Sequence, residues 1–260
     1  MNPLLDPLAK PVIGHRGNRA HAPENTLESF AQAIAAGADA IEFDVHLAAD
    51  GIPVVIHDPT VTRTTGGTGE VARMTLSELQ RLDAGARFTR DAGHTFPYRN
   101  RGIRIPSFVE VLEAFPDIPL LIEIKNPLAA AGILEAIKSH HARDRCLIDA
   151  LDSSSLTTFA GESIATGAAR SGVARLMADV LLRREISRLP YRALCVPLSY
   201  RGLPLPIRRF ARIAPLHNCR VHVWTINDPA VAIELWNAGV NGMISDDPGL
   251  MLPARSQLFT

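Results

Sequence analysis

Cysteine is scarce in this sequence. The three cysteines, Cys146, Cys195 and Cys219, stand far apart, and no two form a Cys-x-x-Cys pair. An odd number of isolated cysteines does not fit a disulfide framework or a zinc site built from paired thiolates. Free thiols are typical of a reducing compartment. We therefore expect a protein stabilised by its hydrophobic core and not by cross-links.

The sequence also lacks a long hydrophobic run and an excess of either charge. No stretch approaches the roughly 18 consecutive apolar residues of a membrane span, and Met1–Pro11 does not resemble a signal peptide. The 27 basic and 27 acidic residues balance, which excludes a general attraction to nucleic acid or to an anionic membrane. We expect a cytoplasmic protein with a small-molecule substrate, no nucleic-acid partner and no stable membrane insertion. The oligomeric state is not indicated.

What the chain does contain is a repeated alternation of short apolar runs with helical patterns, which is typical of a parallel sheet. The expected strands are Pro11–Gly14, Ala40–His46, Pro119–Lys125, Cys146–Leu151, Ala174–Ala178, Ala193–Leu198, Arg220–Ile226 and Gly242–Ser245. The expected helices are Thr26–Ala36, Thr75–Leu82, Ser107–Phe115, Pro127–Ser139, Ser154–Thr166, Val180–Arg188, Ile207–Leu216 and Pro229–Ala238. Eight strands alternating with helices predict an α/β fold, a (β/α)8 TIM barrel forming one domain over residues 1–260.

An open, doubly wound sheet is the alternative architecture. It would be favoured by a Gly-x-Gly-x-x-Gly turn after the first strand. The chain has Gly14-His15-Arg16-Gly17 at that place, so the barrel is preferred.

One segment departs from the alternation. Asp50-Gly51 favours a two-residue hairpin turn, so the run Pro53–His57 should return antiparallel to the second strand and place His57 opposite Asp44. Residues 58–104 follow, rich in Gly, Thr and Arg. Loops of this length are usually functional, and we expect a small inserted subdomain, residues 58–104, over the barrel mouth.

Charged and titratable residues stand where several expected strands end. Alternate residues of a strand point to the same side, and the carboxyl ends of barrel strands meet at one rim. Taken singly, each residue has a structural interpretation, such as a hydrogen-bonded histidine, an ion pair or a core tryptophan. Burying so many charges at one rim without use would be costly, which favours a functional site. Its candidates are His15, Arg16, Glu42, Asp44, His57, Glu123, Lys125 and Trp224.

The residue types indicate the chemistry of this site. Glu42, Asp44 and Glu123 would offer hard oxygen ligands, which suit Ca²⁺ or Mg²⁺. Two histidines could share the roles of general base and general acid. Arginine and lysine could hold a phosphate, and Lys125 is notable because the chain has only two other lysines, Lys10 and Lys138. His46 follows Asp44 on the same face and could support the site from behind.

The motifs containing these residues resemble those of the glycerophosphodiester phosphodiesterases. They are Val12–Gly17, Pro23–Phe30, Glu42–Val45, Pro53–Asp58, Arg63–Thr65, Ile105–Ser107, Glu123–Lys125, Trp224–Asn227 and Ser245–Pro248. The resemblance covers most of the chain in the expected order, although Asn241 stands where an Asp is usual.

The resemblance implies a role for each candidate. Glu42, Asp44 and Glu123 would be metal ligands for one divalent cation, and His15 and His57 the acid–base pair. Arg16 and Lys125 would contact the phosphate. Trp224 would line the glycerol side. Metal-dependent hydrolysis would then release glycerol 3-phosphate and an alcohol. The nucleophile would be either the neighbouring glycerol hydroxyl, which gives a transient cyclic phosphate that water then opens, or water itself.

Three other functions fit a barrel with these residues. A lysophospholipase D would need an apolar groove at the mouth, to which Phe88, Phe96, Tyr98 and Phe108 could contribute. A catalytically silent barrel could bind phosphoesters, and the complete set of carboxylates and histidines argues against it. A sugar-phosphate isomerase would need a glycine-rich phosphate loop late in the chain, for which Asn241-Gly242 or Pro248-Gly249 is weak support. The arginines of Arg87–Arg104 are interpreted as a solvated basic loop.

Overall fold

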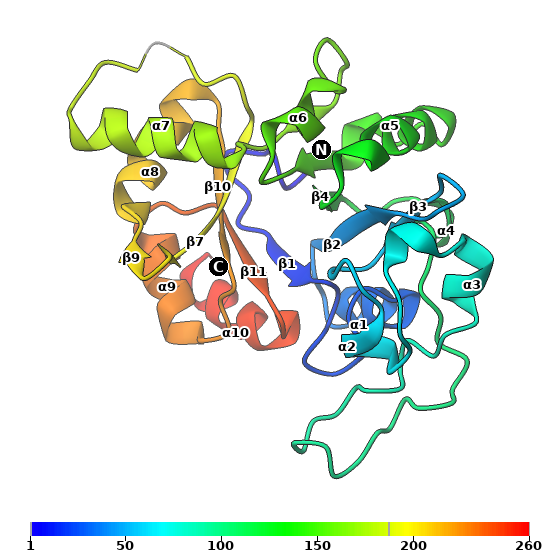
Figure 1. The fold of residues 1–260 in the computed structure, drawn as a ribbon. Coiled ribbons are helices and arrows are strands. Elements are labelled where there is room, and N and C mark those ends of the chain that lie inside the picture. Colours follow the sequence, from blue (N-terminus) through cyan, green and yellow to red (C-terminus); the bar gives the residue numbers. More distant parts are fainter. Residues whose placement is uncertain (1, 187, 260) are drawn as a thin grey trace.

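The computed structural model describes residues 2–186 and 188–259. Eight parallel strands make one sheet, ordered β6-β5-β4-β2-β1-β11-β10-β7. A single parallel bridge between Gly167 and Ala193 joins its two edges, so the barrel is nearly closed (Figure 1). The strands are β1 (Val12–His15), β2 (Ala40–Leu47), β4 (Leu120–Ile124), β5 (Cys146–Asp149), β6 (Ala165–Thr166), β7 (Ala193–Pro197), β10 (Arg220–Trp224) and β11 (Gly242–Ser245). The predicted barrel is confirmed.

Helices lie around the sheet and follow its strands. They are α1 (Leu27–Ala35), α4 (Phe108–Ala114), α5 (Ala130–Ser139), α6 (Ser153–Thr157), α7 (Arg170–Leu181), α8 (Ile207–Ile213), α9 (Pro229–Asn237) and α10 (Pro248–Leu258). Side-chain caps explain several of their beginnings: Thr26 accepts from the backbone N–H of Ser29, and Ser107 forms a capping box with Glu110. Among the described residues, no helix is both long and apolar enough to span a membrane.

The hydrophobic core has a part outside the sheet and a part inside it. Outside, aromatic residues such as Phe30, Phe43 and Phe108 fill the space between helices and strands. Inside, Leu4 packs against Leu121 and other apolar residues of the strands. The N-terminal segment is also bonded to the barrel, because the Leu4 carbonyl lies 2.9 Å from Nε2 of the buried His222. Packed side chains therefore fill the barrel interior beneath the carboxyl ends of the strands.

The fifth barrel strand was predicted in the wrong place. Ala174–Ala178 lies inside α7, whereas the strand itself is Ala165–Thr166. This two-residue strand is too short to show a period, and the run Ala-Arg-Leu-Met-Ala favours a helix intrinsically. The helices expected over Ser154–Thr166 and Val180–Arg188 are also wrong, since α6 ends at Thr157 and α7 ends at Leu181. Both errors follow from the missed strand. Position 187 lies outside the described residues.

The hairpin after β2 forms, but its register differs from the prediction by one residue. Strand β3 (Pro53–Val55) pairs antiparallel with β2 so that His46 faces Val54. The loop has three residues, not two, because the Ile52 carbonyl accepts from Ala48 and Gly51 takes φ 78°. A type I turn followed by a left-handed glycine gives this geometry. Ile56, and not His57, therefore bonds to the backbone of Asp44.

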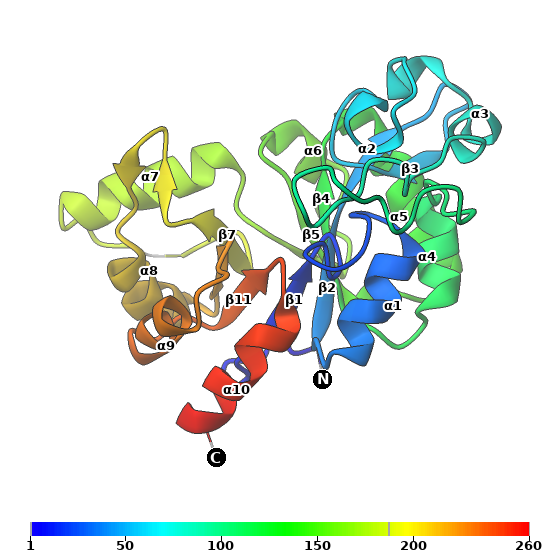
Figure 2. The ribbon, with the colours of Figure 1, turned by 90° about the horizontal axis from the view of Figure 1, so that it is seen from below.

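Residues 58–104 contribute no barrel strand. They hold α2 (Thr62–Thr65), the 3-10 turn η1 (Val71–Arg73) and α3 (Leu76–Gln80). Val61, Val71 and Leu79 of this segment share a small hydrophobic cluster with residues of the β2–β3 hairpin such as Val54 and Ile56. Figure 2 shows α2 and α3 at the opposite end of the molecule from the two termini. A second short hairpin, β8 (Ser199–Tyr200) with β9 (Leu203–Pro204), follows β7.

Candidate active site

A cavity of about 180 Å³ opens at the carboxyl ends of the barrel strands. Seven of the eight predicted site residues line it, and the eighth, Asp44, lies directly behind them in contact with Arg16 and Lys125. The lining residues are His15, Arg16, Glu42, His57, Leu121, Glu123, Lys125, Asp149, Leu151, Cys195, Trp224 and Ile244.

The three predicted carboxylates come together. Glu42 and Asp44 are alternate residues of β2 and point to one side, while Glu123 faces Asp44 in register from β4. One oxygen from each of the three lies within 4.8 Å of the other two. Burial, together with the charges of Asp44 and Glu123, raises the pKa of Glu42. The three carboxylates therefore repel one another, and a divalent cation, which prefers oxygen ligands, would relieve this repulsion.

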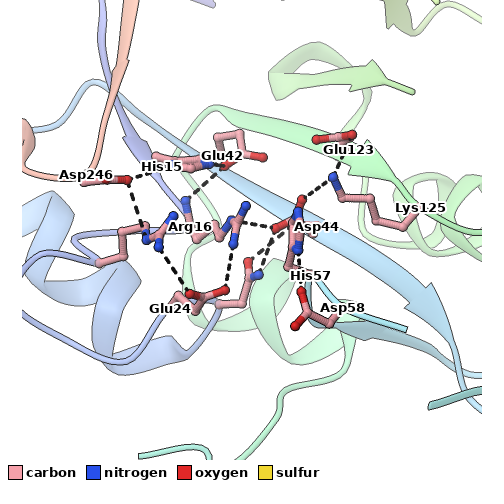
Figure 3. Close-up of polar contacts among 12 residues, drawn as sticks. His15, Arg16, Glu24, Glu42, Asp44, His57, Asp58, Glu123, Lys125 and Asp246 are labelled. Carbon is pink, nitrogen blue, oxygen red and sulfur yellow. Dashed lines mark hydrogen bonds and ion pairs between the residues drawn. The ribbon is translucent and has the colours of Figure 1, made fainter. Parts of the chain in front are cut away.

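Two basic side chains partly balance this charge (Figure 3). Nζ of Lys125 lies 2.7 Å from Glu123 and 3.0 Å from Asp44. Burial alone would raise the pKa of Asp44, but the charges of Lys125 and Arg16 outweigh it and lower this pKa. Asn25 adds a hydrogen bond of 2.9 Å to the same carboxylate. Asp44 is therefore held ionised among fixed partners.

Each predicted histidine is held by an aspartate. Nδ1 of His15 lies 2.6 Å from Asp246, and Nδ1 of His57 lies 2.6 Å from Asp58. In both rings, Nε2 is left for other partners, as in histidines that transfer protons. On His15 it points toward Glu42, at 4.0 Å. The two aspartates were inside recognised motifs, but sequence reasoning gave them no role.

His15 has a further support. Asn227 donates to Asp246 through its side chain, and its side-chain oxygen accepts from the backbone of the same aspartate, both at 2.9 Å. Burial would raise the pKa of Asp246, but bonds with His15 and Asn227 and the charge of Arg19 lower it. Asp246 is therefore a fixed acceptor for the ring of His15.

Glu24, another residue that the sequence reasoning missed, joins the rim to the segment of residues 58–104. It accepts from Arg16 at 2.8 Å and from Arg63 at 2.7 Å and 2.8 Å. Burial would raise the pKa of Glu24, but the hydrogen bonds of Arg63 and the charge of Arg16 lower it to about 2. Arg63 also bonds Asp58. Arg16 itself has φ 52°, which lets its backbone N–H reach Glu42 at 3.0 Å.

Asp149 is a further missed residue of the cavity. It ends β5, in register with Glu123 on β4. Burial, reinforced by the charge of Glu123, raises its pKa to about 8. The sequence signal was available, since an aspartate ends a buried strand as the other site residues do.

His46 lies behind the site. Its Nε2 is 3.0 Å from the backbone carbonyl of His57, so it fixes the segment that presents His57. Asn241 lies at the opposite end of the barrel, where its side-chain oxygen accepts from the backbone of Val221. This departure from the family pattern is therefore remote from the cavity.

The four aromatic residues that could have contributed to the groove of a lysophospholipase D do not gather at the cavity. Phe108 is buried in the core against Phe43, because it faces the sheet from α4. Phe88 and Tyr98 stack edge-on at 5.2 Å, and Phe96 lies against Arg99. None of these four residues lines the cavity. Phe88 instead lines a second hollow beside Arg19, Arg63 and Arg87.

The chain resembles known proteins along most of its length. Residues 15–250 match the glycerophosphoryl diester phosphodiesterase family. A glycerophosphodiester phosphodiesterase of Caldanaerobacter subterraneus subsp. tengcongensis is 33% identical over 249 residues, covering 93% of this chain and 96% of that protein. A phosphodiesterase of Oleispira antarctica, solved with the product sn-glycerol-3-phosphate, is 28% identical with a TM-score of 0.77, covering 95% of this chain and 96% of that one.

A protein of Silicibacter pomeroyi, 24% identical with a TM-score of 0.79 over 99% of this chain and 96% of that chain, shows the same fold. The family match spans the histidine, carboxylate and lysine positions that meet at the cavity. The chain therefore belongs to the glycerophosphoryl diester phosphodiesterase family, and it is a hydrolase of glycerophosphodiesters.

Proposed function

We propose that this hydrolase works with one divalent cation, Ca²⁺ or Mg²⁺, held by Glu42, Asp44 and Glu123. The observation that supports this most strongly is the convergence of three carboxylate oxygens within 4.8 Å at the cavity. When bound, the cation would neutralise charge that develops on the phosphoryl oxygens. The other proposals concern the chain's own side chains.

Arg16 and Lys125 are proposed to bind the phosphate. Both line the cavity, and both are already oriented by carboxylates. Because those ion pairs fix the side chains before the substrate arrives, little conformational entropy is lost on binding. The guanidinium fork of Arg16 can meet two phosphate oxygens, whereas Lys125 acts as a point charge.

His15 and His57 are proposed as the acid–base pair. Each has Nδ1 on an aspartate, so Nε2 can exchange a proton with the substrate. One ring would take the proton from the nucleophile, which is either the neighbouring glycerol hydroxyl or water, and the other would protonate the leaving alkoxide. Attack by the glycerol hydroxyl would give a transient cyclic phosphate, which water then opens. The products would be sn-glycerol 3-phosphate, the ligand of the Oleispira antarctica neighbour, and an alcohol such as choline or ethanolamine. Trp224 would line the glycerol side.

The surroundings of the site support further proposals. The inserted segment, residues 58–104, would cover part of the barrel mouth, because Arg63 reaches Glu24 at the rim. The balanced charge argues for a small-molecule substrate and against a nucleic-acid partner. Three free cysteines favour the cytoplasm.

A metal add-back assay tests this function. Glycerophosphocholine and lysophosphatidylcholine are supplied to the enzyme with a chelator and then with Ca²⁺ or Mg²⁺. We expect hydrolysis of glycerophosphocholine to stop with chelator and return with the cation. Glu42→Gln and His57→Ala should each lose about 10²-fold or more in kcat, as when one stabilising or proton-transferring group is removed. Near wild-type turnover in either variant would contradict the assignment, and exposed Glu113→Gln is the control.

A further inference from the structure

The cavity has two unlike halves. One is ionic, and it is formed by β1, β2, β4 and the hairpin segment that carries His57. The other is formed by β5, β7, β10 and β11, whose lining residues are mainly apolar: Leu151, Cys195, Trp224 and Ile244. Asp149 is the one carboxylate among the described residues of this second half. The reacting phosphate belongs to the ionic half, so an organic part of the substrate must occupy the other.

Asp149 carries one oxygen without a hydrogen-bond partner. Its Oδ1 atom is out of contact with solvent and has no hydrogen-bond partner within the described part of the chain. Gly167, at the end of β6, makes room for it, because any side chain there would collide with Oδ1. A buried carboxyl oxygen without a hydrogen bond is costly. Asp149 nevertheless lines the cavity and is only partly buried, so the rest of its carboxyl group is what a ligand in the cavity would meet.

Hydroxyl and ammonium groups of the substrate are the partners that this carboxyl group could meet. A hydroxyl can donate to a carboxylate and can accept from a carboxylic acid, so it suits Asp149 in either protonation state. A quaternary ammonium has no N–H to offer. The cavity volume of about 180 Å³ is below that of sites for drug-sized ligands, about 300 Å³ and above. It therefore suits a short polyol backbone that packs its carbons on apolar walls such as Trp224.

We propose that Asp149 hydrogen-bonds a hydroxyl of the substrate's glycerol moiety, which makes Asp149 a specificity-determining residue of this hydrolase. Glycerol is the part that all glycerophosphodiesters share, whereas the second alcohol varies, so a fixed buried acceptor matches glycerol. The inference rests on the proposed function, because it places the phosphate at the ionic half.

Binding of two matched ligands tests this inference without requiring turnover. n-Propyl phosphate is sn-glycerol 3-phosphate without its two hydroxyls. Their dissociation constants are measured by calorimetry on the cation-loaded protein. We expect the wild type to prefer glycerol 3-phosphate by about tenfold or more, the effect of roughly one hydrogen bond, and Asp149→Ala to lose most of this preference. Asp149→Asn should retain much of it, because the amide also donates and accepts.

Two further variants make the test specific. Asp144→Ala removes an exposed aspartate just before the other end of β5 and should behave as wild type. Gly167→Ala leaves Asp149 in the sequence but pushes a methyl group into its Oδ1, and it should reduce the preference independently. This variant is informative if Asp149→Ala fails to fold.

Several results would overturn the inference. One is an unchanged preference in a folded Asp149→Ala variant. Another is an equal loss of affinity for both ligands, which would place Asp149 at the phosphate. A third is weakened binding of ethanolamine with the preference intact, which would place Asp149 at the head group. Failure of the proposed function looks different, because hydrolysis of glycerophosphocholine would then persist with chelator or in Glu42→Gln.

Discussion

At the scale of single residues, the site depends on partners that hold each functional side chain. Arg16 and Lys125 are paired with carboxylates before a substrate arrives, and His15 and His57 each have an aspartate behind the ring. Such supports fix orientation and tautomer, so reaction does not have to begin by ordering flexible groups. Removing a support should therefore impair turnover more than substrate binding.

Asp246→Asn tests this at His15. The amide carries no charge to stabilise a protonated ring and no longer fixes the tautomer of His15, so we expect kcat to fall by about 10²-fold with little change in KM. Steady-state kinetics on glycerophosphocholine measures both constants. Asp247→Asn is the matched control, because Asp247 bonds His21 and caps α10. It should lower the melting temperature and spare kcat, and equal losses in the two variants would contradict the role of Asp246.

At the scale of elements, the hairpin between β2 and β3 presents His57. Its register follows from a left-handed residue, Gly51, with φ 78° and open space where a side chain would lie. The same geometry explains why a dipeptide signal alone gave a register wrong by one residue. Asp50-Gly51 is compatible with two-residue and three-residue loops, and only the backbone angles separate them.

Gly51→Ala should destabilise the protein by about 1 kcal/mol, because an L side chain is strained at this φ while nothing nearby collides with it. Urea unfolding measures the difference. Gly249→Ala is the comparison, since Gly249 lies in α10 without a positive φ and with ordinary contacts. That variant should be neutral or slightly stabilising. An equal loss in both variants would show that the strain at Gly51 is not the cause.

Glu24 connects two elements, the loop after β1 and the inserted segment, and it should make stability depend on pH. Its pKa is lowered from 4.5 to about 2, so the folded state binds this proton less readily than the unfolded chain. The stabilisation, on the order of 3 kcal/mol, is complete above pH about 4.5 and is lost as the pH falls toward 2.

Unfolding free energies at pH 6 and pH 3 test this expectation. The wild type should lose more stability between these two values than Glu24→Gln, which has no titrating group at this position. Exposed Glu113→Gln is the control and should follow the wild type. If Glu24→Gln and the wild type lost equal stability, the ion pairs with Arg16 and Arg63 would not stabilise the fold.

At the scale of the whole molecule, most of the barrel and much of its site followed from the sequence. Seven strands carried enough apolar residues to be located, and the site residues stood at strand ends, where the barrel geometry brings them together. The fifth strand could not be found, because Ala165–Thr166 is too short to show a pattern. Glu24 and Asp246 were missed as site residues because their importance depends on partners distant in sequence, whereas Asp149 could have been found from its place at the end of a buried strand.

The central claim also concerns the whole molecule. It is that strands far apart along the chain bring Glu42, Asp44 and Glu123 together to hold a cation. Anomalous scattering from crystals grown with Mn²⁺, which favours the same oxygen ligands as Mg²⁺, tests it directly. We expect one strong peak at about 2.0–2.6 Å from an oxygen of each carboxylate, and none in crystals of Glu42→Gln. A peak bound elsewhere, or no peak in crystals of an enzyme that stays active, would contradict the claim.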